Sequence, residues 1–343
     1  MNTDQLKGKK ILFFLARTFG LEEQIKKKLE SLGANVTFYD ERLKDNTFTK
    51  GIIRLRKELY EQKINRYYRK ILKNIQHETY DFLLVIRGEV VPEFFLKAFR
   101  KRQPKCVCIF YNWDSFTNTG HSSSLLHYYD RALTFDPEDA KRFNIHFRPL
   151  FFFDKYREIS TDKSKQDIDI LFLGTAHSDR YIISNRINEW AKAKQLKMLC
   201  YYYMHGRLVY LFKKFFDKTF KYFDYNKLSF RSLSLGEIID YYKRTKVVLD
   251  INHPNQKGLT LRTFEAIGAK RKLITTNSDI AKFPFYNTSN YLIIDRNASS
   301  IPEAFVQSPY LPLNDDIYDK LSIEGWLKNL FFDYEDEFWK KCL

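Results

Sequence analysis

Short apolar runs alternate with helix-like stretches along this chain, and this alternation restricts the fold more than any other feature. Each run is only a few residues long, as expected of a buried strand. Strands that alternate with helices favour a parallel, doubly wound sheet, because each helix carries the chain back to the same end of the sheet. In the first half of the chain the runs are KKILFFLA, NVTFY, DFLLVI, CVCIFY and ALTF, at residues 9–16, 35–39, 81–86, 106–111 and 132–135.

The alternation stops at the polar stretch Ser160–Asp167 and then starts again. We therefore expect an α/β protein of the GT-B-like kind, with two Rossmann-like doubly wound domains that face each other across a cleft. The first domain is predicted over residues 1–158 and the second over 165–310, and a helical tail over 311–343 could cross back to the first domain. In the second domain, strands are predicted over 168–173, 197–202, 247–251, 272–276 and 291–295, and helices over 182–193, 235–244 and 260–268.

The composition limits the class of protein. Of the 343 residues, 44% are hydrophobic, which is enough for two buried cores. No apolar run approaches the roughly 18 residues that a membrane span needs, and none has the features of a signal peptide, so a cytoplasmic protein is expected. The four cysteines show no CxxC spacing, which favours buried thiols over disulfides or a metal site.

The loop and helix that follow the strand at 247–251 have the residues of an anion-binding site. The first turn of a helix presents free backbone N–H groups and the positive end of the helix dipole. Thr260 is predicted to cap this helix, and Arg262 lies in its first turn, where a guanidinium can neutralise phosphate charge. Glu265 lies in the second turn, where a carboxylate could accept hydrogen bonds from a ribose diol. The preceding loop adds Asn252, His253, Lys257, Gly258 and Leu259 to the predicted donor-binding set.

The sequence RTFEAIGAKRKLITTN, at residues 262–277, resembles the donor-binding signature of the GT-B glycosyltransferases. It is most similar to the bacterial branch that includes the spore-coat protein CgeB and the group 1 enzymes of surface-polysaccharide synthesis. The segments YYDRALTFDPEDAKRF and RPLFF, within residues 128–152, resemble the same branch. In that superfamily the helix glutamate binds the ribose and the loop before it holds the diphosphate, which would give these roles to Glu265 and to Gly258, Leu259, Thr260 and Arg262. The resemblance implies transfer of a sugar from a nucleotide-sugar donor to a bacterial surface glycan or glycolipid.

One position departs from the GT-B pattern. Many retaining members have a second glutamate eight residues before the ribose glutamate, and this chain has Lys257 there. The stereochemistry of transfer is therefore left open, although a lysine would suit a departing diphosphate. Without the resemblance, an ordinary helix in which Arg262 and Glu265 form an i,i+3 ion pair explains the same residues.

Four further site residues are predicted from their places at strand ends. Thr175, in the turn GTAH, and the nearby Arg180 are assigned to the donor site. An inverting transfer also needs a general base beside the acceptor hydroxyl. Glu89 in IRGEV and Asp114 in YNWDSF each follow a strand of the first domain and are the candidate catalytic residues, although each could instead cap a helix or face water.

We expect neither a metal nor a cofactor, because the nucleotide sugar is a substrate. The DID sequence at residues 167–169 matches the metal-binding DxD pattern of a different glycosyltransferase class. That pattern normally follows a strand, and here it opens one, so we interpret the match as chance. The helix start, Lys257 and Arg262 would stabilise the departing diphosphate.

The formal net charge of +16 bears on the partners of this chain. Two basic amphipathic stretches, Ile52–Ile75 and Arg207–Tyr225, could either pack on the core or lie on an anionic membrane. Together with the charge they favour a peripheral contact with the inner face of the cytoplasmic membrane, where a lipid-linked acceptor would be available. Two alternatives are kept: a nucleic-acid-binding protein, although no known module is recognisable, and a catalytically silent relative that binds a glycan or scaffolds other enzymes.

Overall fold

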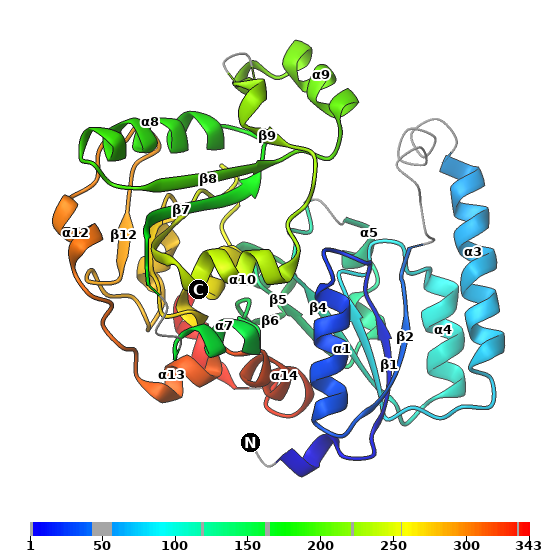
Figure 1. Ribbon diagram of the computed structural model, residues 1–343. Helices are drawn as coiled ribbons and strands as arrows, with labels where there is room; N and C mark the ends of the chain where they lie inside the picture. Colours follow the sequence, from blue (N-terminus) through cyan, green and yellow to red (C-terminus); the bar gives the residue numbers. More distant parts are fainter. Residues whose placement is uncertain are drawn as a thin grey trace. The chain divides into compact units, whose positions relative to one another are not determined.

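The computed structural model describes residues 3–42, 57–117, 120–161, 165–220, 223–254, 256–334 and 336–343, without the side chains of residues 3, 4 and 57–60. The chain forms two compact units (Figure 1). Unit 1 consists of residues 1–149 together with 324–341, and unit 2 of residues 150–323. The chain thus passes from one unit to the other at Pro149 and Leu150, earlier than the polar stretch Ser160–Asp167 from which we predicted the boundary.

Unit 1 contains a six-stranded sheet in the order β2-β1-β3-β4-β5-β6, and every adjacent pair is parallel. Both faces of this sheet are covered, so its strands need apolar side chains on both sides and have continuous apolar sequences. In β3, for example, all five residues are buried. The strands are β1 (Lys10–Phe14), β2 (Asn35–Tyr39), β3 (Phe82–Ile86), β4 (Val107–Asn112), β5 (Arg131–Thr134) and β6 (His146–Phe147).

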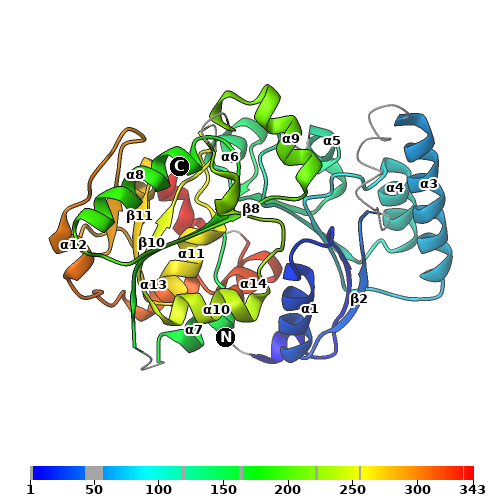
Figure 2. The same cartoon turned by 45° about the horizontal axis from the view of Figure 1, so that its top comes forward.

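The helices of unit 1 cover both faces of its sheet. In Figures 1 and 2, α1 lies on one face and α3 and α4 lie on the other. The α-helices are α1 (Leu21–Ser31), α3 (Lys57–Asn74), α4 (Glu93–Arg102), α5 (Gly120–Ser123) and α6 (Pro137–Phe143). Short 3-10 turns occur at Thr3–Leu6 and Leu126–Tyr128.

The end of the chain belongs to unit 1. Helix α14 (Ile323–Phe331) and the 3-10 segment Glu337–Cys342 pack against it. Trp326 is fully buried, with its ring 5.0 Å from that of Tyr111. The buried Arg148 guanidinium lies 5.2 Å from the ring centre of Trp339.

Unit 2 repeats the design with a second six-stranded parallel sheet, in the order β12-β11-β10-β7-β8-β9. Helices α8 and α10 lie on opposite faces of this sheet (Figures 1 and 2). The strands are β7 (Ile168–Thr175), β8 (Met198–Tyr203), β9 (Leu228–Ser229), β10 (Thr245–Asp250), β11 (Lys272–Thr275) and β12 (Tyr291–Ile293). The α-helices are α7 (Asp154–Ile159), α8 (Arg180–Ala193), α9 (Arg207–Phe216), α10 (Leu235–Lys243), α11 (Leu261–Gly268), α12 (Glu303–Gln307) and α13 (Asp315–Lys320), with 3-10 turns at Lys218–Phe220, Tyr225–Lys227 and Ser278–Lys282.

The predicted fold class is confirmed, since both units are doubly wound parallel sheets. Strands β6 and β9 escape prediction because two residues are too few to show a periodic pattern. The long basic helix predicted from Ile52 begins outside the described residues and is described as α3 from Lys57. Within the described part of the chain, no helix is both long and apolar enough to cross a membrane.

Candidate functional site

The strand order of unit 2 changes direction between β7 and β10. Strands β8 and β9 extend the sheet on one side of β7, whereas β10, β11 and β12 extend it on the other. Connections that leave in opposite directions open a crevice beyond the carboxyl ends of the two central strands, where open α/β sheets bind ligands. Thr175 ends β7 and Asp250 ends β10, so the structure brings the predicted donor residues that follow these strands to one edge.

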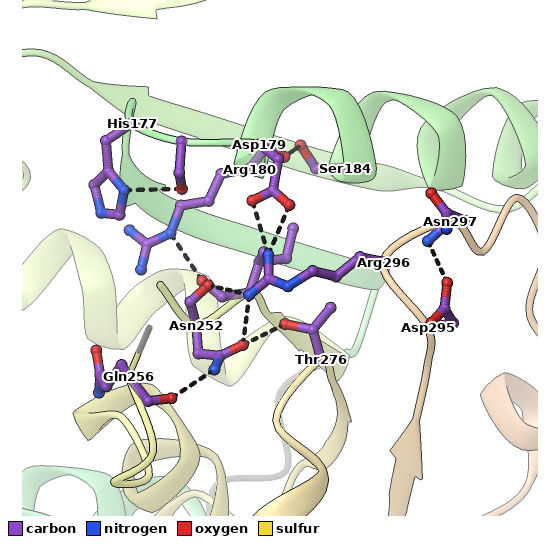
Figure 3. Close-up of polar contacts among 12 residues, drawn as sticks. His177, Asp179, Arg180, Ser184, Asn252, Gln256, Thr276, Asp295, Arg296 and Asn297 are labelled. Carbon is purple, nitrogen blue, oxygen red and sulfur yellow. Dashed lines mark hydrogen bonds and ion pairs between the residues drawn. The ribbon is translucent and has the colours of Figure 1, made fainter. Parts of the chain in front are cut away.

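Arg180 connects the two central strand ends. Its Nε donates to the backbone oxygen of Ile251 at 2.8 Å, and its NH1 lies 3.3 Å from Thr175 Oγ1. Figure 3 shows the guanidinium between the loops that follow β7 and β10. Burial lowers the pKa of Arg180 from its ordinary value, although Asp250 acts in the opposite direction. Arg180 therefore combines a structural role with a positive charge at the predicted donor site.

Arg296 is a site residue that the sequence analysis missed. Its NH1 donates to both carboxylate oxygens of Asp179, at 2.8 and 2.7 Å. Its NH2 donates to the backbone oxygen and the Oδ1 of Asn252, at 2.8 and 3.0 Å (Figure 3). Thr276 donates to the same Oδ1 at 2.6 Å. Arg296 follows the predicted strand at 291–295, so the strand-end rule that selected Thr175 would also have selected it.

The start of α11 differs from the prediction in one respect. Thr260 occupies the N-cap position, but its side chain accepts no hydrogen bond from the helix. Instead the Thr260 and Thr263 hydroxyls donate to Asp250 Oδ2, at 2.6 and 3.0 Å. Asp250 is 4% exposed, and a buried carboxylate without donors costs more than an open cap. The predicted capping role of Thr260 is therefore wrong, and its hydroxyl does not occupy the N–H groups of the first turn.

Tyr242 of α10 and Glu265 of α11 are buried, and they form a cluster with the partly buried Arg262. Arg262 NH1 donates to Glu265 Oε2 at 2.5 Å, and the Tyr242 hydroxyl donates to the same oxygen at 3.1 Å. Burial opposes the charge on Arg262, but the carboxylate of Glu265 outweighs it and raises the pKa of the guanidinium. The i,i+3 ion pair that the sequence offered as an alternative is thus present. A role of Glu265 towards ribose stays a prediction.

The loop before α11 is held in place through hydrogen bonds to its backbone oxygens. The side-chain amide of Asn277 donates to the backbone oxygens of Lys257 and Gly258, at 3.0 and 3.4 Å. Leu259 is buried in the core of unit 2, whereas the side chains of Lys257 and His253 are exposed. The loop therefore leaves the Lys257 ammonium accessible to an anionic ligand.

His177 lies beside this loop, with its ring centre 5.8 Å from that of His253. Burial, followed by the positive charges of Arg180 and Lys213, lowers the pKa of His177 to about 3. At neutral pH this imidazole is uncharged, so the positive potential near β7 comes from Arg180 and Lys213 and not from His177.

In unit 1 the strand order reverses between β1 and β3. Of the two predicted catalytic carboxylates, Glu89 follows β3 and Asp114 follows the neighbouring strand β4. Arg87 NH2 is 3.2 Å from Asp114 Oδ2 and 3.4 Å from Glu89 Oε2. Glu89 is also ion-paired with Arg42. Arg87 has a φ of 75°, an unusual backbone conformation for a residue other than glycine, and such strain is common at functional sites. The structure therefore brings Glu89 and Asp114 together around Arg87.

Glu41 is a second residue of this cluster that the sequence analysis missed. It is fully buried, and its Oε1 accepts a hydrogen bond from the backbone N–H of Glu89 at 3.2 Å. Its Oε2 has no hydrogen-bond partner among the described residues. Burial raises the pKa of Glu41 to about 7. The negative charge of Glu89 also raises this pKa, whereas the positive charges of Arg42 and Arg87 lower it. The sequence could have indicated Glu41, because it closely follows strand β2 and so meets the strand-end rule that selected Glu89.

The DID sequence makes ion pairs instead of a cluster of carboxylates. Asp167 bonds to Arg244 and Lys197 at 2.6 and 2.7 Å, and Asp169 bonds to Lys246 at 2.8 Å. Over the described ranges, no group of three or more His, Cys, Asp and Glu side chains is placed to hold a metal ion.

Comparisons with known proteins agree on the fold. No protein-family model matches the chain, and no curated protein matches its sequence. Among solved structures, an α,α-trehalose-phosphate synthase (UDP-forming) from Burkholderia xenovorans is similar with a TM-score of 0.59, at 12% identity, over 95% of this chain and 100% of that one. A glycosyltransferase from Rickettsia africae is similar with a TM-score of 0.50, at 11% identity, over 98% and 92% of the two chains.

A UDP-GlcNAc 2-epimerase from Methanocaldococcus jannaschii is also similar, with a TM-score of 0.50, at 12% identity, over 94% of this chain and 99% of that one. At such identities the likeness concerns the fold alone. This chain has the GT-B-like fold of two Rossmann-like domains, and its structural neighbours include GT-B glycosyltransferases.

Proposed function

We propose that this chain is a metal-independent glycosyltransferase that moves a sugar from a nucleotide-sugar donor to a bacterial surface glycan or glycolipid. The observation that carries the proposal is the position of Arg180, Asn252 and the start of α11. All lie at the edge where the sheet of unit 2 reverses its order. That edge is where a fold of this kind binds ligands. The GT-B fold and the RTFEAIG sequence support a nucleotide sugar as the ligand.

The donor diphosphate would lie at the start of α11. The Thr260 hydroxyl bonds to Asp250 and does not cap the N–H groups of Leu261 and Arg262, whereas the Thr263 N–H donates to the Thr260 backbone oxygen. Arg180 and the exposed Lys257 would supply positive charge from the adjoining loops, which stabilises a departing diphosphate without a metal ion. The Glu265 carboxylate, fixed by Arg262 and Tyr242, would accept hydrogen bonds from the ribose.

The acceptor would be activated by a carboxylate of unit 1. Glu89 and Asp114 are the candidates, and Arg87 holds both. A base must reach the acceptor hydroxyl directly, and both side chains are only partly buried. Loss of transfer with donor binding preserved, in Glu89→Gln or Asp114→Asn, would identify the base.

Calorimetry with UDP-, GDP-, CMP- and ADP-sugars in the presence of EDTA tests the proposal. We expect one nucleotide class to bind, and Arg180→Met to weaken that binding about tenfold or more, because it removes a charge-assisted contact. Glu189→Gln is the matched control, since Glu189 is an exposed residue of the same helix. The absence of binding by every donor would refute the proposal.

Product analysis then separates the remaining candidates. A transferase releases nucleotide in an acceptor-dependent manner, whereas an epimerase, the activity named for the similar M. jannaschii protein, returns the donor as its epimer. Binding without turnover would indicate a catalytically silent relative. Steeply salt-dependent binding of DNA or RNA, without donor binding, would favour the nucleic-acid alternative.

A further inference from the structure

Helix α9 (Arg207–Phe216) carries its large apolar side chains on the surface of unit 2. Leu208 is 82% exposed, Phe212 63% and Phe215 80%. Val209, Leu211 and Phe216 are also exposed. The helix lies on the connection between β8 and β9, and in Figures 1 and 2 it lies beyond β8, apart from α8 and α10.

These side chains form one face of the helix. Positions 208, 211, 212 and 215 recur at the spacing of a single helical stripe. Tyr210 is on the other side, 4% exposed and packed in the core of unit 2, so it anchors the helix. Helix α9 therefore reverses the usual arrangement, in which a surface helix turns its apolar face inward.

Basic residues flank the apolar face. Lys213 and Lys214 place their ammonium groups 4.8 Å from the ring centre of Phe220 and 5.8 Å from that of Tyr210. Arg207 lies at the start of the helix and Lys218 just beyond its end. Arg207, Lys214 and Lys218 thus lie beside the apolar stripe, whereas Lys213 is half-buried over Phe220 on the inner side of the helix. Positive groups beside an exposed apolar stripe are the distribution of a helix that lies in the interface of an anionic bilayer.

Helix α3 provides a comparison within the same chain. It is also basic and amphipathic, but its apolar residues Ile64, Tyr68 and Ile71 are buried in the core of unit 1. The folding of unit 1 accounts for the apolar face of the described part of α3. It does not account for the face of α9, because that face is exposed to solvent in the described structure.

We propose that α9 is the membrane-contacting element of this protein and that it binds an anionic lipid surface with Leu208, Phe212 and Phe215 inserted. A second copy of the chain fits the face less well, because pairing would bring the Arg207, Lys214 and Lys218 groups of both copies together. One ten-residue helix also offers less area than the roughly 800 Å² per partner of a stable interface. The inference extends the proposed function and does not depend on the identity of the donor.

Vesicle sedimentation of the full chain tests the proposal. We expect binding to vesicles of 70% phosphatidylcholine and 30% phosphatidylglycerol at low salt, and much weaker binding to pure phosphatidylcholine. The double variant Phe212→Ser/Phe215→Ser should lower the partition coefficient about tenfold or more, because two inserted phenyl groups are lost. Leu311→Ser is the matched control, since Leu311 is a 53% exposed leucine elsewhere in unit 2.

Three results would overturn the proposal: no binding of the wild type to the anionic vesicles, equal binding of the double variant, or a wild-type dimer in light scattering that the double variant abolishes. The variant should fold, since both side chains are exposed, and circular dichroism with thermal unfolding checks this. Donor binding by calorimetry should be the same in both proteins. A failure of the lipid proposal is thereby separated from a failure of the proposed function.

Discussion

Arg296 holds Asp179 through both of its carboxylate oxygens, and its other terminal nitrogen holds Asn252. The three residues come from the turn after β12, the residue before α8 and the loop after β10. A single guanidinium therefore fixes the geometry of three strand-end connections on which the candidate donor site depends.

Substitution of Arg296 by Met should destabilise unit 2 and weaken donor binding. The Asp179 carboxylate and the backbone oxygen of Asn252 would lose the Arg296 donor, at a cost of about 1–3 kcal/mol in the free energy of unfolding. Urea denaturation measures the loss. Arg231→Met is the control, because the Arg231–Glu237 pair is much more exposed, and it should change stability far less. Equal effects of the two variants would contradict the prediction.

Gly268→Ala should destabilise unit 2, because a Cβ at this position would lie 2.5 Å from Phe152 Cγ. Overpacking of this kind costs about 1–3 kcal/mol. Gly236→Ala in α10 is the control, since the nearest atom to its added Cβ is Ser234 Oγ at 4.0 Å. That change should stabilise the protein by about 0.5–1 kcal/mol, as alanine favours a helix. Thermal unfolding of the two variants should therefore shift in opposite directions.

The Arg262–Glu265 pair allows structural and binding roles to be separated. Glu265→Met should lower the free energy of unfolding by about 1–3 kcal/mol, because it leaves the partly buried Arg262 without its carboxylate partner. The double variant Arg262→Met/Glu265→Met should recover most of that loss. If Glu265 binds ribose, donor affinity measured by calorimetry will not recover with stability. Recovery of both would assign Glu265 a purely structural role.

The stability of unit 1 should depend on pH through Glu41. Its pKa in the folded protein is about 7, above the ordinary 4.5, so the folded state keeps a proton that the unfolded state releases. Stability is therefore lost as pH rises from about 4.5 to 7. Above about pH 7 the ionisation of Glu41 no longer changes the free energy of unfolding. At about 1.4 kcal/mol per pKa unit, the loss amounts to about 3 kcal/mol.

Glu41→Gln should remove this dependence, because an amide does not titrate. Relative to the wild type, the variant should gain stability between pH 4.5 and 8, as measured by urea denaturation at intermediate values. Glu189→Gln, an exposed change, should follow the wild type throughout. Parallel curves for wild type and Glu41→Gln would show that this carboxyl titrates normally.

Much of the fold could be predicted because its strands are buried on both faces and therefore appear as continuous apolar runs, of which FLLVI in β3 is an example. The donor segment could be located because its strand, loop and helix follow one another in sequence. Arg296 was harder to place, since its bonds to Asn252 span 44 residues and depend on the pairing of strands. The role of Thr260 was mispredicted because no local pattern shows that Asp250 is buried and needs donors.

From the sequence alone, the two basic amphipathic helices cannot be distinguished by whether their apolar faces are buried or exposed. Both α3 and α9 have an apolar face, and only the packing shows that Ile64 is buried while Phe215 is exposed. In the same way, Glu41 is a strand-end carboxylate like Glu89, and only the burial of its side chain distinguishes its pKa. Hydrophobic periodicity identifies a face, whereas tertiary contacts determine what that face meets.

The packing of Trp326 against Tyr111 has a consequence for biosynthesis. Unit 1 is closed by residues 324–341, so a nascent chain that has emerged only as far as Pro149 lacks part of the core of its first unit. Unit 2 consists of residues 150–323 and Cys342, so nearly all of it lies between the two segments that build unit 1. The core of unit 1 can therefore be completed only after residues 150–323 have been synthesised.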